Sequence, residues 1–340
     1  MSAFLSACRR EPTMYTPVWL MRQAGRYQAK YRDIRSKLSF IEMCKTPEIS
    51  AEVTLLPVRQ FGVDAAIQFA DILLILEPLE IGFEFTEKQG PRILKPVRTA
   101  GEIDAIREPV DIRNAIGYLL ESIRIVRAEL SDRVPLIGFA GAPFTLASYL
   151  IEGGASQEYV NTKRLMFSDP TAWDVLMTKL TNAVVEYLNA QVDAGVQALQ
   201  VFDSWVGCLS PADYRKYVRP HMNRLFRALN PSVPVIHFGT GNPALYPLMK
   251  QAGGDVIGID WRADLELQWS ALGEVAIMGN LDPSSLLAPI EEMKQRAKRV
   301  IDSAKSRPGH IFNLGHGVLP QTDESSVKLL VDFVHEYSSR

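Results

Sequence analysis

Cysteine is scarce in this chain of 340 residues, which has only Cys8, Cys44 and Cys208. The three are far apart and form no C-x-x-C pair, which argues against a disulfide framework and a zinc knuckle and fits a reducing cytosol. A surplus of charge is also missing: the net charge is −2, so no overall field attracts nucleic acid or an anionic membrane. We therefore expect a cytoplasmic protein without a nucleic-acid partner.

Long uninterrupted apolar runs are missing as well. The longest uncharged stretch, residues 134–151, has eighteen residues, but Pro135, Gly138, Gly141 and Pro143 interrupt it. This pattern predicts a strand, a loop and a helix rather than a membrane span. The N-terminal apolar run is too short for a signal peptide, and no low-complexity segment or linker divides the chain. We expect residues 1–340 to form one domain with no membrane association.

Eight short apolar runs have the length and the flanks of buried strands. They lack polar alternation, which is typical of strands covered on both faces in parallel sheets. Amphipathic helical stretches lie between most of them, the clearest at 172–195 and 290–304, and the segment 83–97 is predicted as an inserted hairpin. This alternation predicts an α/β fold, a (β/α)8 TIM barrel. The predicted strands are 17–21, 65–69, 135–139, 198–202, 234–238, 256–259, 275–279 and 310–314.

Polar or glycine-rich groups follow nearly every predicted strand. Active sites of such barrels collect where the strands end, so these groups should meet at one face. Turn chemistry alone places some Asp, Asn and Gly at such positions, so the collective pattern carries more weight than any member. The groups are Arg22, Asp71, residues 140–145, Asp203 and Ser204, His237, Asp260, residues 280–282 and residues 315–317.

Two arginines, Arg22 and Arg26, stand four residues apart beside Gly25, in a segment (residues 9–37) with eight basic and two acidic residues. Each guanidinium can present a planar fork to a carboxylate or phosphate, or can form a structural ion pair with a nearby acid. Asp71 follows an otherwise apolar segment and suits a helix cap, a metal ligand or a catalytic charge. His316 lies between two glycines, where the backbone can approach a ligand closely.

The sequence also contains parts of two other kinds of site. Gly239-x-Gly241-x-x-Ala244 after a strand, with Asp260 at the end of the next one, has the spacing of a dinucleotide fingerprint, but four strands precede it and that fingerprint normally opens its sheet. For zinc, no cysteine follows His237 at short spacing, and the other histidines do not cluster. We expect no bound metal.

Five longer motifs resemble those of the uroporphyrinogen decarboxylase family, in family order and over nearly the whole chain. Their lengths make accidental agreement remote. The resemblance implies a single-domain (β/α)8 barrel of haem biosynthesis that acts as a homodimer and needs no cofactor. The motifs are PVWLMRQAGRY (17–27), AAIQFADIL (65–73), GFAGAPFTLASYL (138–150), VFDSWVG (201–207) and NLGHGV (314–318).

The resemblance also implies a set of site residues. Asp71 corresponds to the central catalytic carboxylate, and the substrate, uroporphyrinogen III, would be decarboxylated at its four acetates to coproporphyrinogen III. Its eight carboxylates suit arginines at the rim, and its four pyrrole N–H donors suit one carboxylate at the centre. The implied substrate-binding residues are Arg22, Gln23, Ala24, Gly25, Arg26, Asp71, Tyr149, Ser204 and His316.

One departure from the family pattern lies just after the first motif, where Ala29 stands in the place of a common proline. Tyr31 and Arg35 still match the aromatic and basic positions, so the change concerns only the rigidity of this loop. Related methyltransferases build a zinc site from a His-x-Cys element. The sequence here, His237-Phe238-Gly239, lacks that cysteine and favours the decarboxylase branch.

Overall fold

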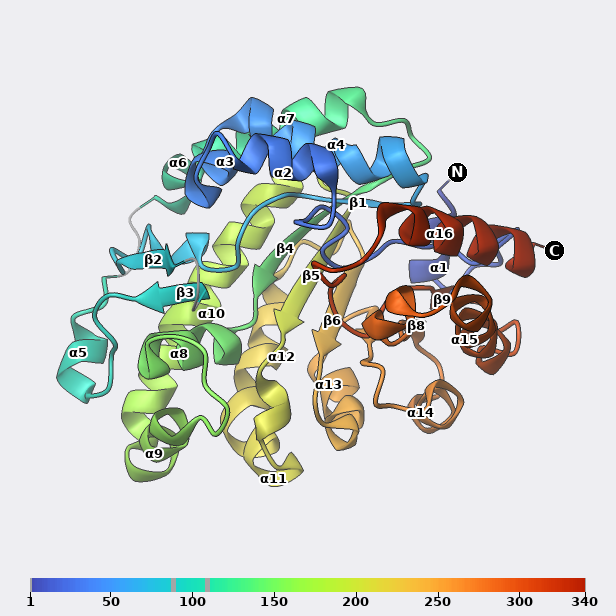
Figure 1. The fold of residues 1–340 in the computed structure, drawn as a ribbon. Coiled ribbons are helices and arrows are strands. Elements are labelled where there is room, and N and C mark those ends of the chain that lie inside the picture. Colours follow the sequence, from blue (N-terminus) through green and yellow to red (C-terminus); the bar gives the residue numbers. More distant parts are fainter. Residues whose placement is uncertain (1, 87–89, 108–110, 340) are drawn as a thin grey trace.

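A curled parallel sheet forms the centre of the protein (Figure 1). The computed structural model describes residues 2–86, 90–107 and 111–339. Within these ranges the sheet has seven strands in the order β1–β4–β5–β6–β7–β8–β9, and each overlaps one of the predicted apolar runs. The strands are β1 (Ala66–Ile67), β4 (Leu136–Gly141), β5 (Ala198–Asp203), β6 (Val235–Gly239), β7 (Val256–Gly258), β8 (Ala276–Met278) and β9 (His310–Ile311). The α/β barrel fold is therefore confirmed.

The prediction of a strand at residues 17–21 is wrong, because this segment does not form a regular strand. Val18 makes one isolated parallel bridge to Phe312, and the amide N–H of Asp64 donates to the Val18 carbonyl (2.8 Å). The segment therefore closes the barrel between β9 and β1 without a ladder. Side-chain oxygens accept hydrogen bonds from N–H groups that would otherwise be available to a neighbouring strand. Val18 N–H donates to Asp64 Oδ2 (2.7 Å) and Met21 N–H to Asn313 Oδ1 (3.1 Å).

Both faces of the sheet are buried, which explains why the strand sequences do not alternate. One apolar cluster takes residues from every strand, among them Ile137, Ile236 and Ile311, together with Trp19. Together with the bonds of residues 17–21 to residues near both β9 and β1, this cluster fits the interior of a closed barrel. A second cluster joins the opposite faces of the strands to the surrounding helices. Each large apolar side chain buried in this way contributes about 1.5–3 kcal/mol.

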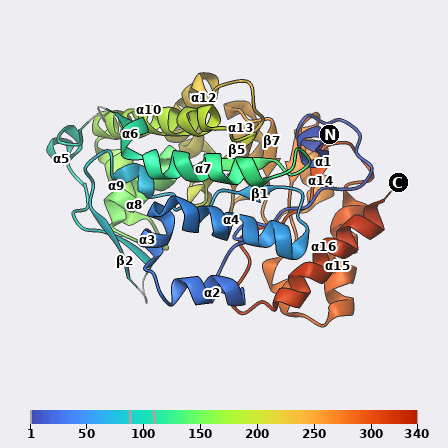
Figure 2. The same ribbon diagram turned by 90° about the horizontal axis from the view of Figure 1, so that it is seen from above.

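Helices surround the sheet, and Figures 1 and 2 show α4 beside α7 and α15 beside α16. The predicted helix at 172–195 is α10, capped by Asp169 at its start and by Gly195 in the left-handed region (φ 118°) at its end. Among the described residues, no helix is both long and apolar enough to span a membrane. The helices are α1 (Ala3–Cys8), α2 (Ala29–Arg35), α3 (Phe40–Lys45), α4 (Pro47–Phe61), α5 (Ala100–Asp104), α6 (Ile112–Ala115), α7 (Gly117–Glu129), α8 (Pro143–Glu152), α9 (Val160–Ser168), α10 (Pro170–Ala194), α11 (Pro211–Asp213), α12 (Arg219–Ala228), α13 (Tyr246–Ala252), α14 (Leu265–Leu272), α15 (Ile290–Ser303) and α16 (Glu324–Ser338).

The hairpin predicted at 83–97 is confirmed as β2 (Phe83–Thr86) and β3 (Gly90–Ile93), which pair antiparallel with Phe83 opposite Ile93. Part of the prediction, residues 87–89, lies outside the described residues. The hairpin is inserted between β1 and β4, and the Ile93 N–H donates to the carbonyl of Gly153 at the end of α8 (2.9 Å). It therefore lies against the helix that carries Tyr149.

Candidate active site

Arg22 begins the site, directly after the segment that closes the barrel. Its backbone lies in the left-handed region (φ 59°), which costs a residue other than glycine roughly 1–2 kcal/mol. Hydrogen bonds on both sides impose this turn. Gln23 N–H donates to the Leu20 carbonyl (2.9 Å), and Val318 N–H donates to the Met21 carbonyl (2.8 Å). Strain that the surroundings impose in this way is typical of functional positions.

Gly317 makes room for the Arg22 side chain. A Cβ atom at position 317 would lie 2.3 Å from Arg22 Cδ and 2.6 Å from Arg22 Cγ, far inside van der Waals contact. The second glycine of the GHG sequence is thus required by packing against an arginine almost three hundred positions away. It also places His316 next to Arg22.

Asp71 follows β1 and is only partly exposed. Its Oδ1 accepts the N–H of Leu73 (2.9 Å), which closes a local turn. The short helix that follows, Leu74–Leu76, has Leu73 at its N-cap and no side-chain cap, so the capping alternative is wrong. Burial raises the pKa of Asp71 from 3.8 to about 6, while the Leu73 hydrogen bond and the charge of Arg22 act in the opposite direction. A carboxyl group with this pKa is mostly ionised at pH 7 and takes up a proton when the pH falls only slightly.

Tyr149, in α8, lies within electrostatic reach of both Asp71 and Arg22. Burial and the charge of Asp71 raise the pKa of its hydroxyl, and Arg22 lowers it. The phenol therefore stays protonated and can donate a hydrogen bond. The ring stacks on Trp205, with centroids 3.8 Å apart, and Trp205 is the neighbour of Ser204. This stacking brings the end of β5, with Ser204, to the helix that carries Tyr149.

His316 lies near two cations. Burial, together with the charges of Arg22 and Arg262, lowers its pKa to about 4, against the opposing effect of Asp260. The imidazole is therefore neutral near pH 7. Its ring meets the Trp261 ring edge-on, with centroids 6.2 Å apart.

The residues between the two arginines shape the loop. Gln23 is 1% exposed, and its side chain accepts from Leu20 N–H (3.1 Å) and donates to the Ala65 carbonyl (3.1 Å). Ala24 is half-buried. The N–H of Gly25 donates to Gln28 Oε1 (3.1 Å). The side chain of Gln23 thus bonds within the protein, and a role for it in contacting substrate remains a prediction.

Arg26 is exposed, and within the described ranges its side chain forms no ion pair or hydrogen bond. The charges of Arg26 and Arg35 both act on the hydroxyl of Tyr31 and oppose the rise of its pKa on burial. The structure therefore brings together Arg22, Asp71, Tyr149 and His316. Arg26 is placed beside Tyr31, at the edge of this group.

The glycine-rich loop after β6 does not leave a phosphate site open. Both the Gly241 N–H (2.6 Å) and the Thr240 hydroxyl (2.7 Å) donate to Asp260 Oδ2. His237 lies inside β6 rather than after it, and its ring packs against Phe226 of α12, with centroids 4.8 Å apart. In the described ranges, no three His, Cys, Asp or Glu side chains are grouped so that they could hold a metal ion.

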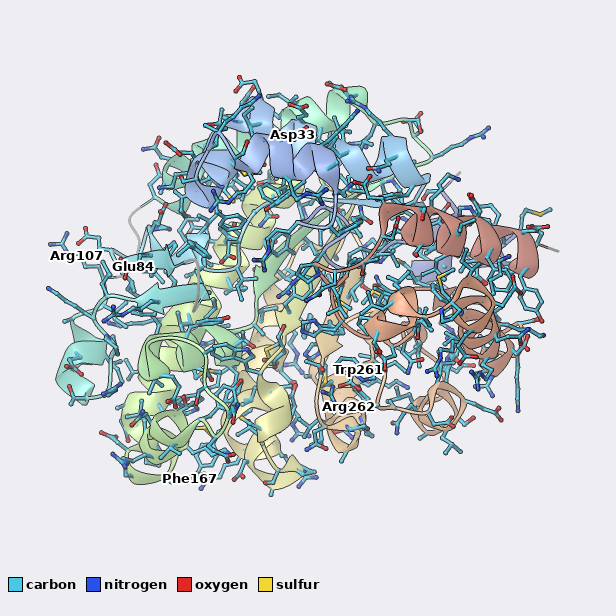
Figure 3. The ribbon with its side chains drawn as sticks, viewed as in Figure 1. Asp33, Glu84, Arg107, Phe167, Trp261 and Arg262 are labelled. Carbon is cyan, nitrogen blue, oxygen red and sulfur yellow. The ribbon has the colours of Figure 1, made fainter. Side chains whose placement is uncertain are left out.

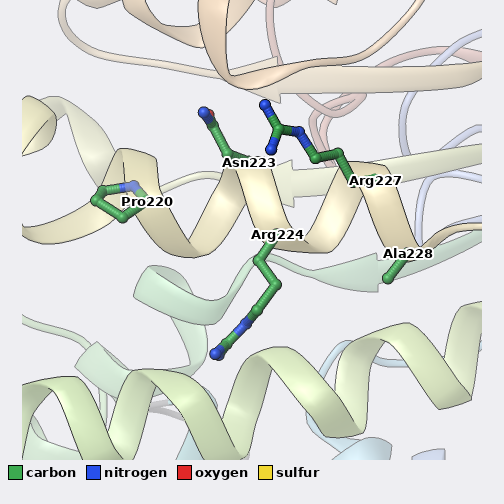
Figure 4. A pocket seen from close by; sticks show the side chains of 5 residues that line it. All are labelled: Pro220, Asn223, Arg224, Arg227 and Ala228. Carbon is green, nitrogen blue, oxygen red and sulfur yellow. The ribbon is translucent and has the colours of Figure 1, made fainter.

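Two surface hollows lie along α12, away from the predicted site residues. The larger, of about 500 Å³, is shown in Figure 4, and a second of about 380 Å³ shares Arg224 and Ala228 with it. None of the predicted site residues lines either hollow, so both belong to the outer face of the helix layer. The larger is lined by Pro220, Asn223, Arg224, Arg227 and Ala228.

Three residues at the mouth were not predicted as site residues. Asp203 is fully buried, accepts from Thr145 Oγ1 (3.0 Å), and has a pKa raised by burial to about 7. Trp205 stacks on Tyr149, and Arg262 follows the strand-end Asp260. The sequence signal was position alone: Asp203 is itself one of the strand-end residues that the pattern marked, and Trp205 and Arg262 each lie within two residues of one.

A curled parallel sheet with Arg22, Asp71, Tyr149 and His316 gathered beyond its strand ends defines an enzyme of the α/β-barrel class. The family model for uroporphyrinogen decarboxylase (URO-D) matches residues 1–337. The uroporphyrinogen decarboxylase of Carboxydothermus hydrogenoformans is 55% identical, over 99% of this chain and 96% of its own length. That of Sorangium cellulosum is 54% identical, over 98% and 95%. This chain belongs to the uroporphyrinogen decarboxylase family.

Solved structures support the fold independently. A methyltransferase from Methanosarcina mazei superposes with a TM-score of 0.84 over 98% of both chains, at 19% identity. A B12-independent methionine synthase from Shewanella sp. W3-18-1 superposes with a TM-score of 0.58 over 88% of this chain and 90% of that one, at 12% identity. At such identities the likeness concerns the fold alone.

Proposed function

We propose that this chain removes CO2 from the four acetate side chains of uroporphyrinogen III and releases coproporphyrinogen III, with Asp71 as the central catalytic group. The observation that carries the proposal is the Asp71 carboxyl group near Arg22 and Tyr149, at the mouth of a barrel of this family. Burial there raises its pKa to about 6. A lone carboxylate there can accept several pyrrole N–H bonds at once, which centres the ring.

The chemistry follows from the ring itself. Protonation of a pyrrole carbon places positive charge on the ring, and loss of CO2 from the acetate returns the electron pair to it. The exocyclic methylene carbon left behind takes up a proton, and the ring carbon gives up the proton it had gained. Overall, one proton replaces each CO2 and leaves a methyl group. The ring acts as its own electron sink, so no cofactor is required. An ionised Asp71 next to that cation stabilises the transition state more than the ground state, and such effects contribute roughly 3–4 kcal/mol.

The rim of the substrate would be bound by the strand-end residues. Arg22 and Arg26 offer planar forks to carboxylates, Tyr149 and Ser204 offer hydroxyls, and Gln23, Ala24 and Gly25 set the loop between the arginines. With a pKa of about 4, His316 is rarely an imidazolium near pH 7. This favours Arg22 or a bound water as the proton donor and leaves His316 as a neutral hydrogen-bonding group.

The test is anaerobic incubation with uroporphyrinogen III, followed by chromatography of the oxidised products, for the wild type and Asp71→Asn. Asparagine keeps the oxygen that accepts Leu73 N–H, so the turn should survive while the charge is lost. We expect turnover to fall by on the order of 100-fold or more, and binding to fall less. A variant with turnover within a few-fold of wild type would refute the role given to Asp71.

The homodimer, which the family resemblance implies, stays a prediction. So do the cytoplasmic location and the absence of a nucleic-acid partner, which were expected from the cysteine content and the net charge. The mass of the purified protein in solution, measured by light scattering, tests the first. A monomer that is fully active would contradict the homodimer as the working form.

A further inference from the structure

Arg262 lies just beyond β7, on the side toward which the arrowheads of β5 and β6 point (Figures 1 and 3). Its guanidinium lies over the Trp261 ring, with Cζ 3.8 Å from the ring centroid. Nη1 is 3.0 Å from Asp260 Oδ2. The Asp260 side chain is fully buried, whereas the Arg262 side chain is 49% exposed. A buried acid and an aromatic face thus hold an arginine that reaches solvent.

Asp260 does not depend on the guanidinium for its hydrogen bonds. Oδ2 accepts from the Thr240 hydroxyl and the Gly241 N–H, and Oδ1 accepts from the main-chain N–H of Arg262 (2.9 Å). The ion pair therefore orients Arg262 more than it satisfies Asp260. In the described part of the chain, Nε and Nη2 of Arg262 have no hydrogen bond, so one edge of the fork is open to a ligand.

The same arginine borders the site already described. Its charge lowers the pKa of His316, as does that of Arg22. Gly315 packs against the backbone of Trp261 so tightly that a Cβ would lie 2.1 Å from Trp261 N. The contact fixes the His316 loop against the Trp261–Arg262 pair, while Gly317, the next residue after the histidine, packs against Arg22.

We propose that Arg262 binds a rim carboxylate of the substrate, as a second arginine near His316 besides Arg22. This rests on the proposed function and adds a second arginine position to it. Two guanidinium groups near one imidazole suit a ligand that carries several carboxylates around one ring. Oriented by Asp260 and Trp261, Arg262 loses little side-chain entropy when it binds an anion.

The competing interpretation is structural: Arg262 would serve only to neutralise Asp260. The two differ in what a neutral side chain should do. Loss of a purely structural ion pair lowers the melting temperature and leaves the kinetics of the folded enzyme unchanged. Loss of a substrate contact raises KM, because a charge-assisted hydrogen bond to carboxylate is gone.

The experiment compares Arg262→Gln with Arg307→Gln, using uroporphyrinogen under anaerobic conditions and recording KM, kcat and melting temperature. Arg307 is a matched control. It also lies over a tryptophan, with Cζ 5.6 Å from the Trp269 ring centroid, but it precedes β9 and so belongs to the other end of the barrel. We expect R262Q to raise KM roughly 10- to 100-fold with kcat nearly unchanged, and R307Q to leave KM unchanged.

An R262Q enzyme with wild-type KM overturns the proposal, whatever its melting temperature. If R262Q does not fold, Arg262→Lys replaces it, since lysine keeps the charge near Asp260 but loses the fork. A raised KM in R262K then supports the proposal, and an unchanged one overturns it. Asp71→Asn in the same assay separates the failure of this proposal from the failure of the proposed function. If D71N is inactive and R262Q has wild-type kinetics, only the role of Arg262 is refuted. If D71N is active, the proposed site itself is refuted.

Discussion

At the scale of the single residue, a substitution of Arg26 tests whether this arginine binds an anion or forms a structural ion pair. Its side chain is exposed and, in the described ranges, has no acidic partner. Arg26→Lys keeps the charge but loses the planar fork. We expect KM for uroporphyrinogen to rise roughly tenfold, while the melting temperature moves little because no core packing is removed.

Arg59→Lys is the control for this substitution, because Arg59 forms a surface ion pair with Glu129 away from the site. Steady-state kinetics and thermal melts of both variants give the answer. A lowered melting temperature with unchanged kinetics in R26K would count against the opening motif as an anion clamp.

The pKa of Asp71 sets an expectation for pH. Burial places it at about 6, above the ordinary 3.8, so the group takes up a proton as pH falls through 6 and loses the charge that catalysis needs. Catalytic activity should therefore decline below about pH 6. Since substrate carboxylates also titrate in acid, the direct measurement is a 13C NMR titration of the Asp71 carboxyl group in the free enzyme. A pKa near 4 in the wild type would contradict the account.

The same titration tests the influence of Arg22 on Asp71. Arg22→Gln should raise the pKa of Asp71, because the Arg22 charge lowers it.

At this scale, the residues that stand out within a single motif could be predicted from the sequence. Those whose role depends on contacts between motifs could not. Asp71 and His316 stand out because each follows an apolar run. The space that Gly317 leaves for Arg22, and the reach of Arg262 toward His316, join positions that are tens to hundreds of residues apart. Periodicity and spacing within one segment hold no information about such pairs.

At the scale of elements, α16 holds the arginine loop in place. Glu324, the first residue of α16, accepts hydrogen bonds from the N–H of Ala29 and from Gln60 of α4. Gln28 then links Gln60 (3.0 Å) to the N–H of Gly25 (3.1 Å). Proline has no N–H, so the bond from Ala29 to Glu324 exists only because the departure from the family pattern restored a donor. This bond restrains the loop whose rigidity the alanine had put in question.

Glu324→Gln tests that link. A glutamine offers one acceptor oxygen instead of two, so one of the two bonds to the loop or to α4 must be lost. We expect KM to rise about three- to tenfold, with a loss of roughly 1 kcal/mol in unfolding free energy. Glu336→Gln, at the exposed far end of α16, serves as the control and should change neither. A loss of stability without a change in KM would show that the network does not position the loop.

The elements themselves were largely predictable, because buried parallel strands and amphipathic helices leave strong local patterns. The run at 17–21 is the exception. Its apolar sequence is that of a strand, but Asp64 and Asn313 supply side-chain acceptors for its N–H groups, and both lie far away in sequence. Whether an apolar run joins a ladder depends on such partners, which the run does not encode.

On the scale of the whole molecule, Asp64 joins the two ends of the chain. It accepts from the Tyr15 hydroxyl (2.8 Å) and the Val18 N–H (2.7 Å), and its Oδ2 lies 2.7 Å from His335 Nε2 of α16. Thr16 N–H also donates to Ser338 Oγ (2.8 Å). These bonds hold the N-terminal segment and α16 together where the barrel closes.

The prediction of one domain for residues 1–340 can therefore be tested by equilibrium unfolding. Trp19 lies in the apolar cluster inside the barrel, and the helices dominate the far-ultraviolet circular dichroism. If the chain is one cooperative unit, tryptophan fluorescence and circular dichroism should give the same urea midpoint. Two separated midpoints would refute the single domain.

The left-handed backbone of Arg22 also bears on how sequences of this kind drift under selection. Glycine or asparagine would adopt that conformation at lower cost, so the position trades stability for a charged group at the mouth. Selection for heat resistance alone would favour the loss of this arginine, and selection for turnover would restore it. A library of variants screened only for survival on heating would then enrich well-folded proteins with a lower affinity for the substrate.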